Sequence, residues 1–264
     1  MTGGRLDDTA ATITKGGAGS DGMFETHGIR VGYSSQACGK ARSDDFFGVS
    51  SAEDAQSAAR GVMLAIADGV SSTGGGGRTA AESVVRMLLS DFYATRADWG
   101  VAHALDKVLS AINSWLFAEN SRQPTAGGMA TTLSLLVLRG RELYLAHVGD
   151  TRVYRLRGGN VERLTRDHVW PRWDMRHTLR RAVGLDQSLV VDYAKEAIEP
   201  GDMYLLVSDG VWEVMGERAM GEALSTASTP EALAQALVAG ATSMQKMYFG
   251  RNDATAVVAL IERC

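Results

Sequence analysis

Short apolar runs alternate with longer amphipathic stretches along this chain of 264 residues. Eight of the runs have the length and the β-branched and aliphatic content of β-strands. They are Gly28–Tyr33, Phe46–Val49, Val62–Ala67, Thr131–Leu138, Leu143–Val148, Val153–Leu156, Met203–Val207 and Ala254–Ile261. Tight turns with glycine, such as Arg139-Gly140 and Gly158-Gly159, join several neighbours. We therefore expect antiparallel hairpins and not a βαβ series.

Three longer segments carry apolar residues at the three-to-four spacing of amphipathic helices. Two of them, Thr79–Thr95 and Val101–Asn120, follow each other closely. The third begins at Ser228-Thr-Pro-Glu231, a capping box with proline in the first turn, and runs to about Met247. This order of strands and helices predicts an α+β sandwich of sheets with helices on the outside.

Composition narrows the class of protein. The length and the apolar fraction of 45% are typical of one globular domain. Residues 1–25 are rich in Gly, Thr and Asp without periodicity, so we expect a flexible lead-in there and one domain over residues 26–264. The net charge of -4 gives no field that would gather nucleic acid. With only Cys38 and Cys264 and no long apolar run, we expect a cytoplasmic protein without disulfides, thiolate zinc or a membrane segment.

Three of the predicted strands lead into an aspartate. Asp68 directly follows one run, and Asp150 and Asp209 follow two others after a single intervening residue. If these strands end at the same edge, their carboxylates converge, and like charges so close need bound cations or bound protons. Oxygen ligands without cysteine or clustered histidine favour Mg²⁺ or Mn²⁺ over zinc. One Asp-Gly pair alone indicates a hairpin turn more often than a site, but three after buried-looking strands indicate a metal site.

Short motifs occur in a fixed order between about Gly28 and Ile261. They are Lys40-Ala-Arg-Ser-Asp-Asp45-Phe, Ala67-Asp68-Gly69-Val70, Gly128-Met-Ala-Thr131-Thr132, Val148-Gly149-Asp150-Thr151-Arg152-Val153-Tyr154, Leu164-Thr165-Arg166-Asp167-His168, Ala182-Val-Gly184, Ser208-Asp209-Gly210 and Asn252-Asp253-Ala254-Thr255. The series resembles that of the type 2C metal-dependent protein phosphatases, the PPM family, in its bacterial branch. The resemblance implies a four-layer αββα sandwich, two antiparallel sheets flanked by helices. It also implies hydrolysis of phosphoserine and phosphothreonine in proteins by a water activated between two Mn²⁺ or Mg²⁺ ions.

The resemblance assigns metal-binding roles by position. Asp68 corresponds to a carboxylate that bridges the two ions, and the Gly69 carbonyl to a ligand of the first. Asp209 corresponds to a ligand of the second ion. Asp150 and Asp209 together match a third, weaker metal position.

The first motif supplies the remaining polar groups of the implied catalytic set, which comprises Asp68, Asp209, Lys40 and Asp44. Asp44 matches an acid that contacts the first ion through water, and Asp45 is the acid beside it. Lys40 stands where the family has an arginine that clamps phosphate. Lysine keeps the positive charge but loses the bidentate fork, and Arg42 is a possible substitute for binding substrate.

The last motif departs from the family, because it reads Asn252-Asp253 where the family has Asp-Asn. Either Asn252 coordinates the second ion through its neutral amide oxygen, or a local shift brings Asp253 to it. Side chains alternate between the faces of a strand, so Asp253 cannot take that place without a backbone adjustment. Asn252 is the positional match and Asp253 a near second.

The segment 168–181 and the histidines leave alternatives open. His168, next to Asp167, is the histidine best placed for a function. Trp170, Trp173 and the arginines that follow either contact substrate or simply pack and carry solvated charge.

Two other functions fit the same motifs. One is a pseudophosphatase that binds phosphoproteins, with catalysis weakened by Lys40 and Asn252. The other is a phosphatase of the related sporulation type, which acts on an anti-anti-sigma protein. For the enzyme we expect a monomer whose partners are phosphorylated protein substrates and a cognate Ser/Thr protein kinase.

Overall fold

The computed structural model describes residues 12–15, 20–51, 55–70, 76–122, 128–175, 177–248 and 252–263. Their strands form two six-stranded sheets, and every pair of neighbouring strands is antiparallel. The first sheet has the order β1 (Thr12–Lys15), β4 (Asp45–Ser51), β5 (Val62–Asp68), β6 (Leu133–Arg139), β7 (Glu142–Val148) and β10 (Asp192–Ala197). The second has the order β2 (Ser20–Thr26), β3 (Ile29–Gln36), β12 (Ala254–Ile261), β11 (Met203–Val207), β8 (Arg152–Arg157) and β9 (Asn160–Arg163).

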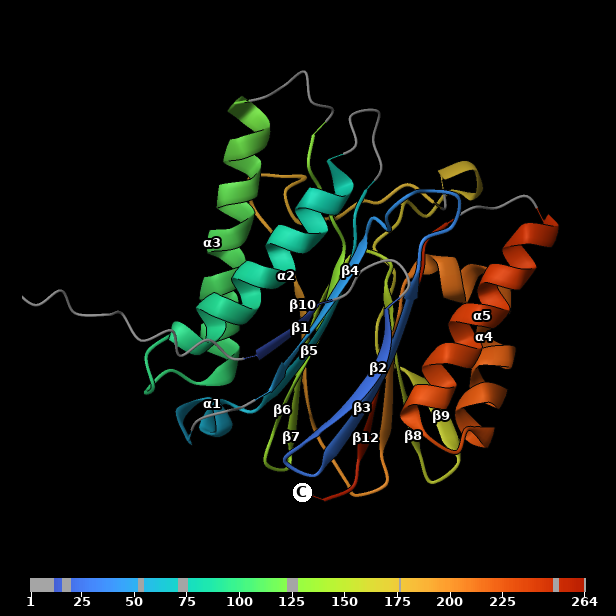
Figure 1. Cartoon of the computed structure of the whole chain (residues 1–264). Helices are drawn as coiled ribbons and strands as arrows, with labels where there is room; N and C mark the ends of the chain where they lie inside the picture. The colour runs from blue at the N-terminus through green and yellow to red at the C-terminus, as the bar shows by residue number, and fades with distance from the viewer. Residues whose placement is uncertain are drawn as a thin grey trace, which may run out of the picture.

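Helices cover the outer face of each sheet (Figure 1). The first sheet carries α2 (Gly77–Ala94) and α3 (Val101–Arg122), and the second carries α4 (Asp209–Thr226) and α5 (Pro230–Tyr248). A short helix α1 (Ala55–Arg60) precedes β5, and a 3₁₀ turn, η2 (Trp173–Met175), lies in the segment between β9 and β10. The predicted α+β fold, a four-layer αββα sandwich, is confirmed.

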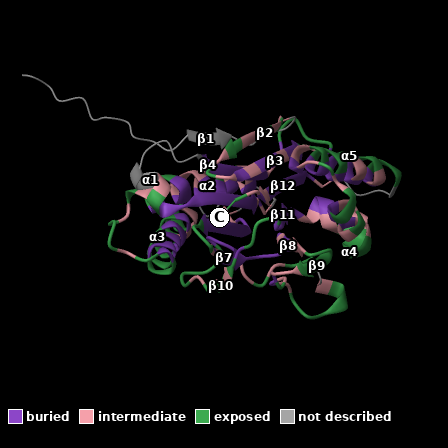
Figure 2. Ribbon diagram, turned by 90° about the horizontal axis from the view of Figure 1, so that it is seen from below, coloured by how far each residue is buried: buried purple, intermediate pink, exposed green. Residues whose placement is uncertain are grey.

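The core consists of three apolar layers, which Figure 2 shows as the buried interior of the molecule. Alternation along each strand sends successive side chains into different layers. On β4, Phe46 packs beneath α2 with Leu88, whereas Phe47 lies between the sheets with Val257 of β12. Leu237 of α5 belongs to the third layer, outside the second sheet. Both faces of the central strands are therefore buried, and only their ends can carry an open polar site.

All the strands and helices predicted from the sequence are present, and the described residues also form elements that were not predicted, among them α1, β9 and β10. Ser20–Thr26, most of which falls in the expected flexible lead-in, is strand β2 and pairs with β3. Thr12–Lys15 pairs with β4 as β1, while residues 1–11 and 16–19 lie outside the described part of the chain. Helix α4 was not predicted, because Gly216 interrupts it with a φ of 71°. Within the described ranges, no helix combines the length and the apolar content needed to cross a membrane.

Candidate active site

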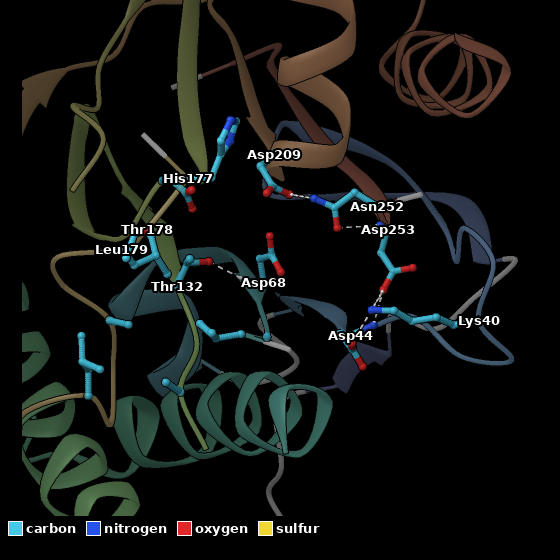
Figure 3. Close-up of a pocket in the computed structure, with 16 residues that line it drawn as sticks. Lys40, Asp44, Asp68, Thr132, His177, Thr178, Leu179, Asp209, Asn252 and Asp253 are labelled. Atoms are coloured by element: carbon cyan, nitrogen blue, oxygen red, sulfur yellow. Dashed lines mark hydrogen bonds and ion pairs between the residues drawn. The ribbon is translucent and has the colours of Figure 1, made fainter. Parts of the chain in front are cut away.

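One edge of the sandwich gathers segment ends from both sheets around a cavity of about 430 Å³ (Figure 3). Asp68 is the last residue of β5, and Asp150 follows β7. Asp209 begins α4 immediately after β11, and Asn252-Asp253 precede β12. Most of the residues predicted for the site line this cavity: Lys40, Asp44, Asp68, Gly69, Asp150, Asp209, Asn252 and Asp253. Carboxylates distant in sequence therefore meet, as the strand-end pattern predicts.

Asp68 and Asp209 face each other in the cavity (Figure 3), close enough for the two carboxyl groups to interact. Burial, then the charges of Asp209 and Asp45, raise the pKa of Asp68 well above its ordinary value. Two carboxylates in contact cannot both stay ionised without a partner of opposite charge. This pair must hold either a proton or a cation.

Asp45 lies behind the cavity, with only 1% of its surface exposed. Its backbone pairs with that of Asp68 at the end of the β4–β5 ladder. One carboxylate oxygen, Oδ2, accepts a 2.7 Å hydrogen bond from the Ser208 hydroxyl, while Oδ1 is buried without a hydrogen-bond partner. Burial raises the pKa of Asp45 well above its usual range, although hydrogen bonds from Thr255 and Ser208 act in the opposite direction. The unpartnered oxygen leaves this acid one donor or one cation short.

Asp150 sits in a loop that is fixed from two sides. The backbone N–H of Gly149 donates to the ring atom Nδ1 of His168 at 3.2 Å. The backbone N–H of His168 donates to the Gly149 carbonyl at 2.7 Å. The Trp212 indole donates to the Asp150 carbonyl at 3.0 Å. Burial, followed by the charge of Asp209, raises the pKa of the Asp150 carboxyl to about 8. This third acid is thus held close to the first two.

The Thr131-Thr132 pair holds the backbone of Asp68. The Asp68 N–H donates to Thr132 Oγ1 at 2.9 Å, and the Asp68 carbonyl accepts from the Thr131 hydroxyl at 2.8 Å. The next residue, Gly69, touches the start of α2 so closely that an added Cβ would lie 2.2 Å from the Gly77 backbone. These contacts explain why the backbone of Asp68 is surrounded by two threonines and two glycines.

Asn252 and Asp253 face different parts of the site (Figure 3). The Asn252 side-chain amide donates to Asp209 Oδ1 at 2.7 Å, and its oxygen accepts from the Asp253 N–H at 3.1 Å. The Asp253 carboxylate accepts from the N–H groups of Cys38 and Asp44, at 3.0 and 2.7 Å. Asn252 is therefore next to the Asp68–Asp209 pair, whereas Asp253 anchors the loop of the first motif.

That loop presents Lys40 to the cavity. The Lys40 ammonium donates to Asp44 Oδ2 at 2.5 Å and lies 3.4 Å from Asp253 Oδ2. Burial alone would lower the pKa of Lys40, but the hydrogen bond to Asp44 and the charges of Asp253 and Asp44 outweigh it and raise that pKa. Arg42 is exposed and is not among the residues that line the cavity. Of the two predicted phosphate-binding groups, the structure brings only Lys40 to the site.

The donor set is suited to hard, partly hydrated cations. The cavity offers carboxylate, amide and carbonyl oxygens, including the facing carboxyl groups of Asp68 and Asp209, and the unpartnered Asp45 Oδ1 is buried behind them. In the part of the chain that the structure describes, no three Asp, Glu, His or Cys side chains are grouped to enclose an ion. Mg²⁺ and Mn²⁺ retain several waters and need only one or two carboxylates each. The residues therefore fit such ions and do not form a closed cage.

Segment 168–181 forms one wall of the cavity through His177, Thr178 and Leu179. Trp173 of η2 is 90% exposed and does not belong to the core. His168 is buried, and its Nε2 lies 3.0 Å from Asp192 Oδ2. His168 thus supports the loop of Asp150 and is not one of the residues that line the cavity.

Comparison with known proteins identifies this arrangement. Residues 31–246 match the sequence model of protein phosphatase 2C. This chain belongs to the protein phosphatase 2C family. The family resemblance expected from the motifs, including the bacterial branch, is therefore confirmed.

Bacterial type 2C phosphatases are among the similar proteins. Serine/threonine protein phosphatase PstP of Mycobacterium tuberculosis is 30% identical over 186 residues, which are 64% of this chain and 35% of PstP. The chain thus spans about a third of that relative. Serine/threonine phosphatase stp of Listeria monocytogenes is 28% identical over 221 residues, 76% of this chain and 84% of stp. The PstP catalytic domain, crystallised with two manganese ions, has a TM-score of 0.71 and 25% identity, and the match covers 89% of this chain and 99% of that domain.

The sequence analysis missed two residues, Ser208 and Gln245, that hydrogen-bond to the residues of the site. Ser208 donates to Asp45 and accepts a 3.0 Å hydrogen bond from the Thr255 N–H. Its position just before Asp209 in a motif could have indicated this. Gln245 of α5 bonds to two site segments, and no motif or spacing in the sequence marks it.

Proposed function

We propose that this chain is a protein serine/threonine phosphatase that uses Mn²⁺ or Mg²⁺ to hydrolyse phosphoserine and phosphothreonine in proteins. Membership of the protein phosphatase 2C family and the names of the bacterial relatives support the reaction. The observation that carries the proposal is that the carboxyl groups of Asp68 and Asp209 face each other within one cavity. Such a pair holds a proton or a cation, and phosphoryl transfer uses divalent cations at this kind of oxygen site.

Asp68 is the best-placed residue to hold two ions, because its carboxyl group faces Asp209 and the next residue, Gly69, also lines the cavity. Asp209 would serve the second ion, with Asn252 beside it, and Asp150 with Asp209 would serve a third, weaker position. When bound, two such ions supply a water nucleophile at neutral pH and polarise the phosphoryl group.

The remaining residues of the site bind and orient. Lys40 offers an ammonium to the phosphate oxygens, and Asp44 holds that ammonium in place through their 2.5 Å hydrogen bond. Because lysine lacks the fork of arginine, it fixes the phosphate by charge more than by geometry. Asp253 serves as the anchor of this loop, since backbone N–H groups and Lys40 already surround its carboxylate.

The expected substrates are phosphorylated proteins, as the names of the relatives indicate. A cognate Ser/Thr kinase, a monomeric state and a cytoplasmic location are parts of the same proposal. They come from the sequence and the family resemblance alone.

The test is release of phosphate from a phosphothreonine peptide with and without MnCl₂. We expect turnover that EDTA abolishes and that Asp68→Ala and Asp209→Ala each reduce by at least about 100-fold. Asp91→Ala, at an exposed position on α2, is the control and should retain full activity. A well-folded protein without turnover at millimolar Mn²⁺, or with turnover that survives both substitutions, would contradict the proposal.

A further inference from the structure

The side chain of Gln245 joins two segments of the site from behind. It projects from α5 and is 3% exposed. Its amide Nε2 donates to the Gly210 carbonyl at 2.8 Å, and its Oε1 accepts from the Asn252 N–H at 2.8 Å. One carboxamide thus uses its donor and its acceptor on residues adjacent to or within the proposed metal site.

The two segments belong to different elements, so their spacing is not set by chain connectivity. Asp209 starts α4 and precedes Gly210, whereas Asn252 precedes β12. The segments pack tightly, because a Cβ added to Gly210 would lie 2.0 Å from the Asp253 carbonyl oxygen. Across this contact the Asn252 amide reaches Asp209 Oδ1 at 2.7 Å. A small change in the separation of the two backbones would therefore move both side chains that would hold the second ion.

Gln245 is also linked through hydrogen bonds to the loop that carries Lys40 and Asp44. The Asn252 oxygen accepts from the Asp253 N–H, and the Asp253 carboxylate holds the Asp44 N–H and Lys40. The backbone that Gln245 fixes at residue 252 is thus the start of a chain of hydrogen bonds that ends at Lys40.

We propose that Gln245 is a positioning residue that sets the affinity of the site for divalent cations by fixing Asp209 relative to Asn252. The inference rests on the proposed function, since it concerns the same metal site. Residues that orient metal ligands without touching the ion commonly change metal affinity or activity by about 10–100-fold when replaced.

The experiment measures Mn²⁺ binding by isothermal titration calorimetry, which needs no turnover, on the full chain and three variants. Gln245→Met removes both hydrogen bonds at similar volume. A neighbouring cavity of about 260 Å³, lined partly by Gln245, leaves room for the change. Gln245→Asn keeps the amide but is one methylene too short to reach both partners. Thr242→Val, at a buried position of α5, is the matched control. It loses the hydrogen bonds that its hydroxyl donates to the Val238 carbonyl (2.7 Å) and Gln36 Oε1 (3.3 Å) and accepts from the Cys38 thiol (3.8 Å), none of which involves Gly210 or Asn252.

We expect both Gln245 variants to raise the Kd for Mn²⁺ by about 10–100-fold, and Thr242→Val to leave it within about twofold. Excess Mn²⁺ should restore most of kcat in the Gln245 variants, which a general loss of folding would not allow. If Gln245→Met does not fold, as judged by circular dichroism, Gln245→Asn carries the test. Wild-type Mn²⁺ affinity in the folded Gln245 variants would overturn this inference alone. Absence of Mn²⁺ binding by the wild-type protein would overturn both it and the proposed function.

Discussion

Replacing Asp209 by asparagine should make the metal-free protein more stable at pH 8, while it removes the response to Mn²⁺. The charge of Asp209 contributes to the raised pKa values of Asp45, Asp68 and Asp150. An acid whose pKa is raised on folding stabilises the folded state below its unfolded pKa, and this stabilisation is lost as the pH rises through the folded pKa. At pH 8 the charges of these acids therefore oppose folding, and this opposition weakens as the pH falls. Asparagine removes the charge and keeps an oxygen for the Asn252 amide.

The magnitude is worked from the repulsion between the neighbouring Asp68 and Asp209 carboxylates. Two carboxylates about 4 Å apart repel by about 4 kcal/mol at an effective dielectric constant of 20, and a shared proton reduces this cost. Loss of an acid in the first turn of α4 opposes the gain by about 0.3–1 kcal/mol. We expect a net gain of about 1–3 kcal/mol at pH 8, which corresponds to a rise in Tm of about 3–10 °C for a chain of this size. At pH 5 the gain should fall below about 1 kcal/mol.

Differential scanning calorimetry on EDTA-treated protein at both pH values measures this effect. Asp91→Asn, an equal loss of charge at an exposed position on α2, is the control and should shift Tm by less than about 2 °C. A cation that binds only the folded protein raises its Tm. With about 1 mM MnCl₂ the Tm of the wild type should therefore rise, and the Tm of Asp209→Asn should not. The reasoning fails if Asp209→Asn is less stable than the wild type at pH 8, or if Mn²⁺ stabilises both proteins equally.

Three further predictions concern neighbouring residues. Asp150→Asn should flatten the pH dependence of metal-free stability, because the pKa of the Asp150 carboxyl is about 8 in the folded protein. The protonated carboxyl stabilises the fold fully below about pH 4, and this stabilisation is lost as the pH rises through about 8. Thermal melts from about pH 4 to 9 measure the difference. Gly210→Ala should cost about 1–3 kcal/mol in urea unfolding, since its Cβ would clash with the Asp253 carbonyl oxygen, whereas Gly221→Ala, with no atom closer than 3.8 Å, should not destabilise α4. Lys40→Met should raise KM for a phosphopeptide about 10-fold or more with a smaller change in kcat, and an unchanged KM in steady-state assays would exclude its role in phosphate binding.

The fold could be predicted where hydrophobic periodicity is strong. Helix α2 buries Val84 and Leu88 on the face that the three-to-four spacing predicts. The same spacing predicts α3 and α5. Strand β2 could not be predicted, because its residues only alternate between half-buried and exposed, and pairing with β3 orders it at the edge of the sheet. Helix α4 was hidden by glycines such as Gly216, which lower helix propensity.

The part of the site that could be predicted is the set of aspartates at the ends of strands. Runs that stop at Asp68, Asp150 and Asp209 indicate convergence, and the structure places these acids around one cavity. The sequence could not say how Asn252 and Asp253 divide their roles, because this depends on which side chain faces α4 and which faces the loop of Lys40. Hydrogen bonds in the structure distinguish the two orientations. Supporting residues such as Gln245 carry no local signal, since their role depends on helix packing.

Anomalous diffraction from crystals soaked in MnCl₂ tests the central claim most directly, because it locates manganese independently of activity. We predict peaks against the carboxylates of Asp68 and Asp209, with Asp68 touching more than one ion. Ordered Asp68 and Asp209 side chains with no manganese between them, or manganese bound only elsewhere on the chain, would contradict the account.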